Sequence, residues 1–134
     1  IEHYISAICP IIDKYGYTNE ETGFHIHIST TKKDGVNFNF YKFMLLCDRA
    51  GLLSSWEARI GYSQNVMDIL SSYTKQASRK IKTKKGTVWN VEKIEANHVE
   101  VKSIGGNGYH QKMDIMIKEF LEYSRYFEET LQKD

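Results

Sequence analysis

Hydrophobic and polar residues alternate most regularly over residues 23–30, which read Gly-Phe-His-Ile-His-Ile-Ser-Thr. Successive side chains of a β-strand point to opposite faces, so this pattern predicts a strand with one apolar and one polar face. The polar face would carry His25, His27 and Ser29. Same-face neighbours in a strand lie roughly 6.5 to 7 Å apart, so both imidazoles could reach one metal-phosphate cluster.

Two further β-like runs, 87–94 and 97–104, lie in the second half of the chain. In the second run the apolar residues Val99 and Val101 alternate with polar ones. The polar positions are His98, Glu100 and Lys102. This pattern predicts a second polar strand face, although such a face can also be the solvated side of an antiparallel sheet.

An amphipathic helix is predicted over residues 1–15, because its apolar residues recur at steps of three and four. Pro10 lies inside this pattern and predicts either a kink or a helix that begins near Pro10. Gly16 is the expected end of the helix.

Further helices are expected on either side of the later strands. The clearest short one covers residues 40–50, with Asn37 as its N-cap and Gly51 as its end. Another is predicted to begin at Ser63, and the glycine-rich stretch 105–108 would permit positive φ angles before a long C-terminal helix. The apolar and small residues that mark this last helix are Met113, Ile117, Leu121, Ser124 and Leu131.

These elements predict an α+β fold in which helices pack on one face of an antiparallel sheet. A length of 134 residues fits a single domain over residues 1–134. The content of 41% hydrophobic and 26% charged residues is ordinary for a globular protein, and a net charge of +1 favours neither a nucleic acid nor an acidic membrane as partner.

Several sequence features bear on the compartment. No apolar run approaches the roughly 20 residues of a membrane span, and no signal peptide is visible, so a cytoplasmic location is expected. Cys9 and Cys47 lie in apolar helical patterns without C-x-x-C spacing, which predicts buried free thiols. Because Ile1 already belongs to a helical pattern, we expect the chain to be a piece of a longer protein.

Arginines and lysines in the middle of the chain are candidates for binding an anion. Arg59 precedes Gly61 and the expected helix start at Ser63, and a guanidinium beside a helix N-terminus can bind an anion. The run 75–85 holds six basic residues, including Arg79, and no acidic one. It can attract phosphate, but it lacks the interleaved aromatic residues of a nucleic-acid strip. Surface-exposed residues in a solvated loop are the alternative in both cases.

The two strand motifs, taken in order, resemble those of the glutamine synthetase-like carboxylate-amine ligases, and most closely the amidoligases, several of which occur in phages. In that superfamily a Gly-x-His-x-His-x-Ser-like strand is followed by a Glu-x-Arg strand, a Gly- or Pro-containing loop and a helix. Here the second motif reads His-Val-Glu-Val-Lys-Ser-Ile-Gly-Gly-Asn-Gly-Tyr. The resemblance covers most of the chain from about Gly23 onward. It implies a partial glutamine synthetase-like catalytic fold, the C-terminal portion of a ligase domain.

The resemblance also implies an activity that depends on ATP and on Mg²⁺ or Mn²⁺. Such a ligase phosphorylates a carboxylate, and an amine then displaces the phosphate; the partners would be a carboxylate and an amine, each a small molecule or a peptide. Carried over by position, His25 and Glu100 would be metal ligands. His27 and Ser29 would contact the nucleotide.

The expected catalytic cations are Lys102 and Arg59, with Arg79 as a further nucleotide contact. Lys102 stands where the family usually has arginine, and would face the phosphoryl group or the carboxylate substrate. Lysine keeps the charge but loses the bidentate fork of the guanidinium.

The family also carries a Glu-x-Glu-like strand upstream of the helix that precedes the His strand, and this chain begins at that helix. Mg²⁺ favours octahedral, oxygen-rich sites, which His25 and Glu100 alone would not complete. We therefore expect either a missing N-terminal segment or partner chain that supplies the acidic ligands, or a domain that has lost catalysis and kept the fold.

Two other functions fit the same residues. A zinc hydrolase could use His25, His27 and a third ligand, because three protein ligands and a water make a catalytic zinc site. That third ligand would be His98, Glu100 or His110. A non-catalytic structural or binding module could use the polar faces to hold a partner. A two-histidine phosphoesterase is disfavoured, because only one His-x-Ser/Thr strand is present.

Overall fold

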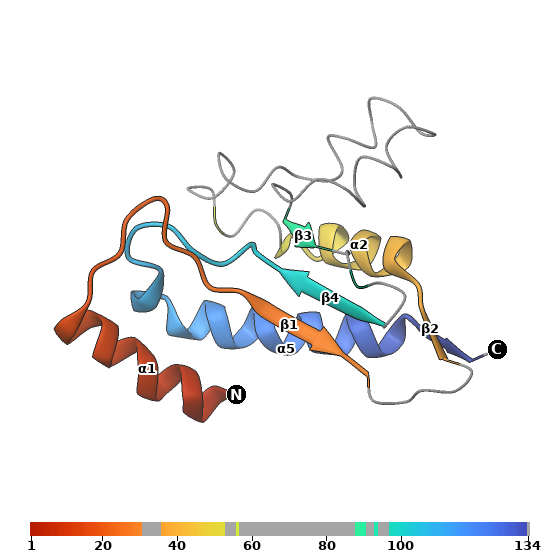
Figure 1. Cartoon of the computed structure of the whole chain (residues 1–134), viewed down its shortest axis with the longest axis horizontal. Helices are drawn as coiled ribbons and strands as arrows, with labels where there is room; N and C mark the ends of the chain where they lie inside the picture. The colour runs from red at the N-terminus through yellow and green to blue at the C-terminus, as the bar shows by residue number, and fades with distance from the viewer. Residues whose placement is uncertain (31–35, 53–55, 57–87, 91–92, 94–96, 134) are drawn as a thin grey trace.

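The computed structural model describes residues 1–30, 36–52, 56, 88–90, 93 and 97–133 of the chain (Figure 1). The elements in these ranges are α1 (Glu2–Tyr15), β1 (Ile26–Ser29), β2 (Val36–Phe38), α2 (Phe40–Arg49), β3 (Trp89–Asn90), β4 (His98–Val101), the 3₁₀ turn η4 (Tyr109–Gln111), α5 (Met113–Glu129) and β5 (Leu131–Lys133). The expected helix from Ser63 and the basic run 75–85 lie outside the described residues.

The strands form two small antiparallel sheets. One has three strands in the order β1-β4-β3, and the other pairs β2 with β5. In Figure 1 the long helix α5 runs behind the three-stranded sheet, and α2 lies beside it. The α+β prediction and the antiparallel pairing are therefore confirmed.

The core lies between the helices and the apolar face of the three-stranded sheet. Val99 and Val101 of β4 are fully buried, and Trp89 of β3 packs among aromatic rings. Its ring centroid lies 5.2 Å from that of Phe43 in α2 and 5.7 Å from that of Tyr123 in α5, both in edge-to-face geometry. The aromatic contacts thus join α2, α5 and the sheet into one core.

Helix α1 runs without interruption from Glu2 to Tyr15 and contains Pro10. The expectation that the helix would begin near Pro10 is therefore wrong. Proline has no N–H group, so Pro10 cannot donate the helical hydrogen bond of its position. Ile5 and Cys9, which precede it, are both buried, and the free energy of their burial offsets this loss. The predicted stop at Gly16 is confirmed, and its N–H donates to the carbonyl of Ile12 at 2.9 Å.

The N-cap of α2 is Asn39, whose side chain accepts a hydrogen bond from the N–H of Lys42 at 3.0 Å. The prediction of Asn37 is wrong, because Asn37 lies in β2 opposite Gln132 of β5. At the other end the prediction holds, since Gly51 follows the C-cap with a φ of 72°.

Helix α5 was predicted correctly, and its core face overlaps the predicted stripe in part. Its fully buried residues are Met116, Glu119, Tyr123 and Phe127. Of the predicted stripe, Met113 and Ile117 are partly buried against the core, as is Leu131, which lies beyond the helix in β5. Leu121 is 54% exposed and does not belong to that face.

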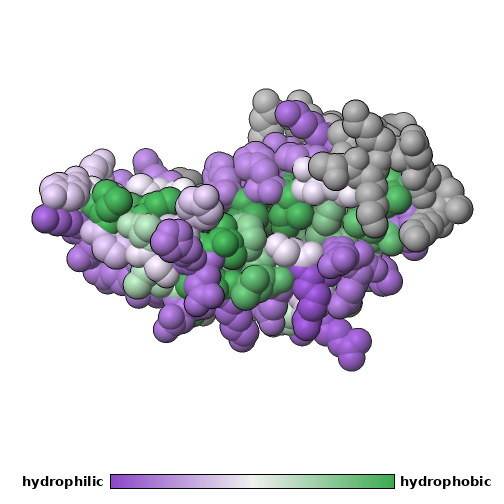
Figure 2. Space-filling view, turned by 90° about the horizontal axis from the view of Figure 1, so that it is seen from below, coloured by the Kyte–Doolittle hydropathy of each residue, from purple (hydrophilic) through white to green (hydrophobic). Residues whose placement is uncertain are grey.

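A second apolar stripe runs along the exposed side of α1. Its members recur at steps of three and four and are exposed by 42% or more: Ile1, Tyr4, Ile8, Ile11 and Tyr15. Figure 2 shows hydrophobic patches on the face seen from below, where α1 lies.

Cys9 and Cys47 are buried free thiols, as predicted. Within the described ranges no helix combines the length and the apolar character needed to cross a membrane.

Candidate functional site

The pairing of β1 with β4 brings the two predicted polar rows together on one face. His27 lies directly opposite Glu100, and Ser29 lies opposite His98. On the other edge of β4, Asn90 of β3 also pairs with Glu100. We call this surface the polar sheet face; its residues are His25, His27, Ser29, Asn90, His98, Glu100 and Lys102.

Glu100 is at the centre of the polar sheet face, and its carboxylate has a partner on each side. Oε1 lies 2.9 Å from Nδ1 of His25 and 3.8 Å from Nε2 of His27. Oε2 accepts a hydrogen bond from Nδ2 of Asn90 at 2.8 Å, and Nζ of Lys102 lies 3.9 Å away. The residue is 9% exposed, so the central strand presents a nearly buried carboxylate with donors around it.

These partners decide the protonation state of Glu100. Burial, the largest single influence, raises its pKa, because a low-dielectric environment disfavours the charged form. The hydrogen bond from Asn90 and the charge of Lys102 act in the opposite direction, as do His25 and His27. The net result is a pKa below the ordinary value of 4.5, so Glu100 is an anion at neutral pH.

The contact with Glu100 fixes the orientation of His25. Because a carboxylate only accepts hydrogen bonds, Nδ1 of His25 carries the proton that it donates to Oε1. In the neutral ring Nε2 is then the lone-pair nitrogen, and the side chain is 46% exposed. A carboxylate that holds one imidazole nitrogen commonly directs the other toward a metal or a substrate.

His27 and His98 form a second pair on the same face. Nδ1 of His27 lies 3.2 Å from Nε2 of His98, so one ring donates and the other accepts. The pKa of His98 is lowered by burial and by the nearby charges of His27 and Lys93, against an opposite effect of Glu100. His98 therefore favours the neutral form. Its Nδ1 is buried without a hydrogen-bond partner among the described residues, so the ring proton belongs on Nε2, which donates to Nδ1 of His27.

The residues of the polar sheet face do not by themselves fit a resident Mg²⁺. His25 and Glu100 do meet, as the resemblance implies, but at hydrogen-bond distance. Within the described ranges no group of three or more His, Cys, Asp or Glu side chains is arranged to hold a metal ion. A single carboxylate beside a lysine is also poorer in oxygen ligands than Mg²⁺ requires.

The structure places five of the seven predicted site residues on this one face. They are His25, His27, Ser29, Glu100 and Lys102. Arg59 and Arg79 lie outside the described residues. Sequence reasoning missed Asn90, the donor to Oε2 of Glu100. The run 87–94 was predicted to be a strand, but only its register against β4 shows that Asn90 faces the carboxylate.

The glycine-rich stretch 105–108 contacts the loop that connects α1 to β1. Three of its glycines, at 105, 106 and 108, have positive φ angles, as predicted. The N–H of Gly106 donates to the carbonyl of Thr22, and that of Gly108 donates to Oγ1 of Thr18. These amides therefore hold the connection between α1 and β1 rather than a phosphate.

Comparison with known proteins gives no relative: no family model matches the chain, and neither the curated proteins nor the solved structures contain a significant match. Function must therefore be argued from the polar sheet face.

Proposed function

We propose that this chain is part of an ATP-dependent carboxylate-amine ligase whose polar sheet face binds the phosphates of ATP and the carboxylate substrate. The observation that supports this most strongly is the position of Glu100, a nearly buried carboxylate that orients the surrounding donors. A partial glutamine synthetase-like fold, with an antiparallel sheet backed by α5, is part of the proposal.

The exposed imidazole of His27 and the ammonium group of Lys102 supply donors for phosphate oxygens, and His25 offers an acceptor nitrogen. The side chains of His25 and His27 are 46% and 59% exposed, so a ligand can reach both. Lys102 is 16% exposed, and its ammonium group is held 3.9 Å from Oε2 of Glu100. It can neutralise charge on a transferring phosphoryl group as a point charge, without the two parallel hydrogen bonds of an arginine.

The proposed reaction has two steps. A carboxylate oxygen of the substrate attacks the γ-phosphorus of ATP, the bond to the bridging oxygen breaks, and ADP leaves. The amine nitrogen then attacks the acyl carbon, and phosphate leaves with the pair of electrons of the C–O bond. The amine loses a proton to Nε2 of His25, whose other nitrogen is held protonated by Glu100.

ATP enters this proposal as its Mg²⁺ complex, and no ligand of the metal is assigned to the polar sheet face. The zinc hydrolase gains no comparable support. His110, one of its candidate ligands, hydrogen-bonds Asp13 of α1 rather than a residue of the polar sheet face. A non-catalytic binding module remains the alternative that experiment must exclude.

Thermal unfolding with and without ATP and Mg²⁺ tests the proposal. At an ATP concentration one hundred times the Kd, binding stabilises the folded state by about 2.7 kcal/mol. We expect Lys102→Met to abolish most of this shift, and Lys118→Met, which removes an exposed lysine of α5, to leave it intact. The absence of an ATP-dependent shift, or an equal shift in the Lys102 variant, would refute the assignment of the phosphate site.

A further inference from the structure

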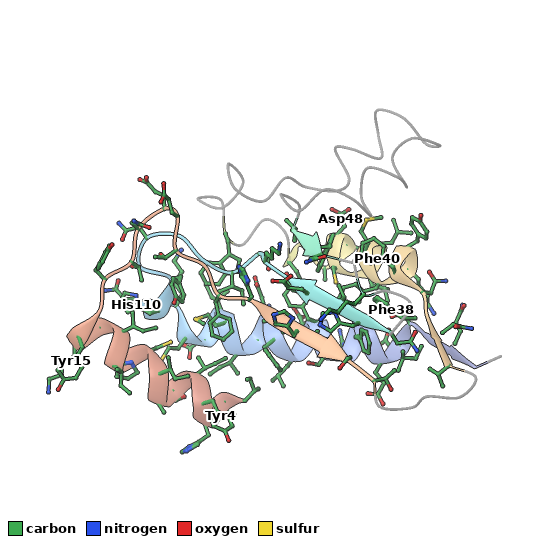
Figure 3. The ribbon with its side chains drawn as sticks, viewed as in Figure 1. Tyr4, Tyr15, Phe38, Phe40, Asp48 and His110 are labelled. Atoms are coloured by element: carbon green, nitrogen blue, oxygen red, sulfur yellow. The ribbon has the colours of Figure 1, made fainter. Side chains whose placement is uncertain are left out.

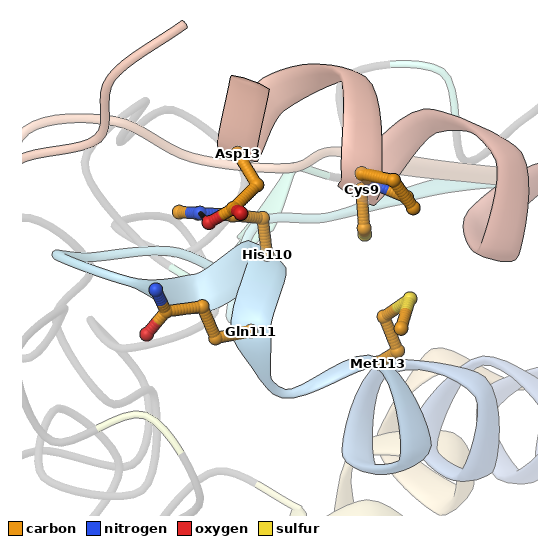
Figure 4. A pocket seen from close by; sticks show the side chains of 6 residues that line it. Cys9, Asp13, His110, Gln111 and Met113 are labelled. Carbon is orange, nitrogen blue, oxygen red and sulfur yellow. Dashed lines mark hydrogen bonds and ion pairs between the residues drawn. The ribbon is translucent and has the colours of Figure 1, made fainter.

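A cavity of about 320 Å³ lies at the end of the molecule formed by α1, η4 and the start of α5. Figure 4 shows it from close by. Its lining residues are Cys9, Pro10, Asp13, His110, Gln111 and Met113. None of them belongs to the polar sheet face, and the volume is in the range of small-molecule sites.

The polar wall of the cavity is a hydrogen-bonded pair, Asp13 and His110. Nε2 of His110 lies 3.2 Å from Oδ1 of Asp13, and Figure 4 shows the two side chains pointing toward one another. His110 is 8% exposed, and its Nδ1 is buried without a hydrogen-bond partner among the described residues. A proton on Nδ1 would have no acceptor there, so the ring proton belongs on Nε2, where the carboxylate accepts it.

The carboxylate of Asp13 is held in place by His110 and stays open to solvent. Its side chain is 63% exposed, and Oδ1 accepts a hydrogen bond from Nε2 of His110. The two neighbouring lysines extend toward aromatic rings instead. Nζ of Lys14 lies 5.0 Å from the ring centroid of Tyr15, and Nζ of Lys112 lies 5.4 Å from that of Trp56.

The remaining lining combines the polar Gln111 with the less polar Cys9, Pro10 and Met113, and the cysteine is not a nucleophile. Cys9 is 2% exposed, and its Sγ lies 4.0 Å from Sδ of Met116. Burial raises the pKa of its thiol, which disfavours the reactive thiolate. The Cys, His and Asp of this cavity therefore form a binding surface rather than a catalytic triad, with Pro10 and Met113 completing its apolar side.

We propose that this cavity binds a small primary ammonium compound with a short aliphatic arm. The ammonium group donates hydrogen bonds to the carboxylate of Asp13, which His110 holds in position. The arm packs against Pro10 and Met113. Figure 3 shows His110 beside α1. No lining residue of the cavity belongs to the polar sheet face, so this site does not depend on the proposed ligase chemistry.

Titration of the isotope-labelled 134-residue chain with n-butylammonium chloride, followed by NMR, tests this site. We expect saturable shift changes at His110, Gln111 and Met113, and affinity about three- to fivefold weaker in Asp13→Asn, since an ion pair with an exposed carboxylate is partly screened by water. The matched control is Asp48→Asn, which removes an exposed carboxylate from α2 and should leave the affinity unchanged (Figure 3).

A second comparison uses the wild-type chain alone and so does not depend on the folding of a variant. n-Butanol has the same arm without the charge, and we expect it to bind about three- to fivefold more weakly than n-butylammonium. Equal affinity of the two compounds, unchanged affinity in Asp13→Asn, or no saturable change at the cavity residues would each overturn the proposal.

Discussion

Replacing Glu100 by glutamine removes one charge from the polar sheet face and changes little else in shape. In the wild-type chain both oxygens of Glu100 accept hydrogen bonds, one from Nδ1 of His25 at 2.9 Å and one from Nδ2 of Asn90 at 2.8 Å. A glutamine has one oxygen and one NH₂ group, so one of these two donors then faces another donor. The attraction of Lys102 to the carboxylate is lost as well.

The expected loss of unfolding free energy at pH 7 is about 1.5 to 3 kcal/mol, the range for a hydrogen bond to a charged group. The low exposure of Glu100 favours a loss in the upper part of this range. If the ring proton of His25 moves from Nδ1 to Nε2, Nδ1 can accept from the glutamine NH₂ group, and the loss falls in the lower part. Urea unfolding of both chains measures the difference. The control is Glu129→Gln, whose carboxylate is 51% exposed and lies 3.8 Å from Arg125; it should change stability by less than about 0.5 kcal/mol.

The pH dependence gives a second check on the same substitution. The folded-state pKa of Glu100 is below its unfolded value near 4.5, so the carboxylate's contribution to stability is fully present above that pH. It is lost as the pH falls through the folded-state pKa. The difference between wild type and Glu100→Gln should therefore shrink as the pH is lowered below about 4.5. A difference that is absent at pH 7, or that grows toward low pH, would refute the proposed electrostatics.

The remaining predictions concern packing and the link between the two sheets. Ile5 is 2% exposed and Ile8 is 44% exposed, so Ile5→Ala should cost about 3 kcal/mol in urea unfolding and Ile8→Ala less than about 0.5; equal costs would contradict the assignment of the core face of α1. Asn97 has a φ of 50°, and its side chain accepts from the N–H of Phe38 and donates to the carbonyl of Val36. Asn97→Ala should cost about 2 to 4 kcal/mol, and Asn97→Gly, which tolerates this φ, about 1 kcal/mol less; an equal cost would show that backbone strain is not involved.

Local alternation was enough to predict β1 and β4, because a period of two residues is visible without knowing what the strands contact. It also predicted which side chains share a face, and the register that places His27 opposite Glu100 agrees with it. Asn90 could not be predicted as a site residue, because it reaches Glu100 only through the pairing of β3 with β4. The residue pattern within a single strand does not reveal which strand lies next to it.

The errors have a common physical cause in contacts between distant segments. Asn37 and Asn39 are equally good caps by residue type, and the choice was decided by β5, which pairs with β2 from the other end of the chain. In α5 the apolar residues surround much of the helix, so periodicity identified the buried stripe only in part. Glu119 is buried there because its Oε2 accepts a hydrogen bond from Nε1 of Trp56 at 2.7 Å, a contact that hydropathy cannot predict.

The central claim, that the polar sheet face binds nucleotide phosphates, is tested most directly by imidazole NMR. All five histidines can be followed in one titration of the ¹⁵N-labelled chain with ATP and Mg²⁺. We predict saturable changes in the ring nitrogens of His25 and His27, with His3 and His110 unchanged because they lie on α1 and η4. Unchanged rings at His25 and His27, or equal changes at all five histidines, would contradict the account.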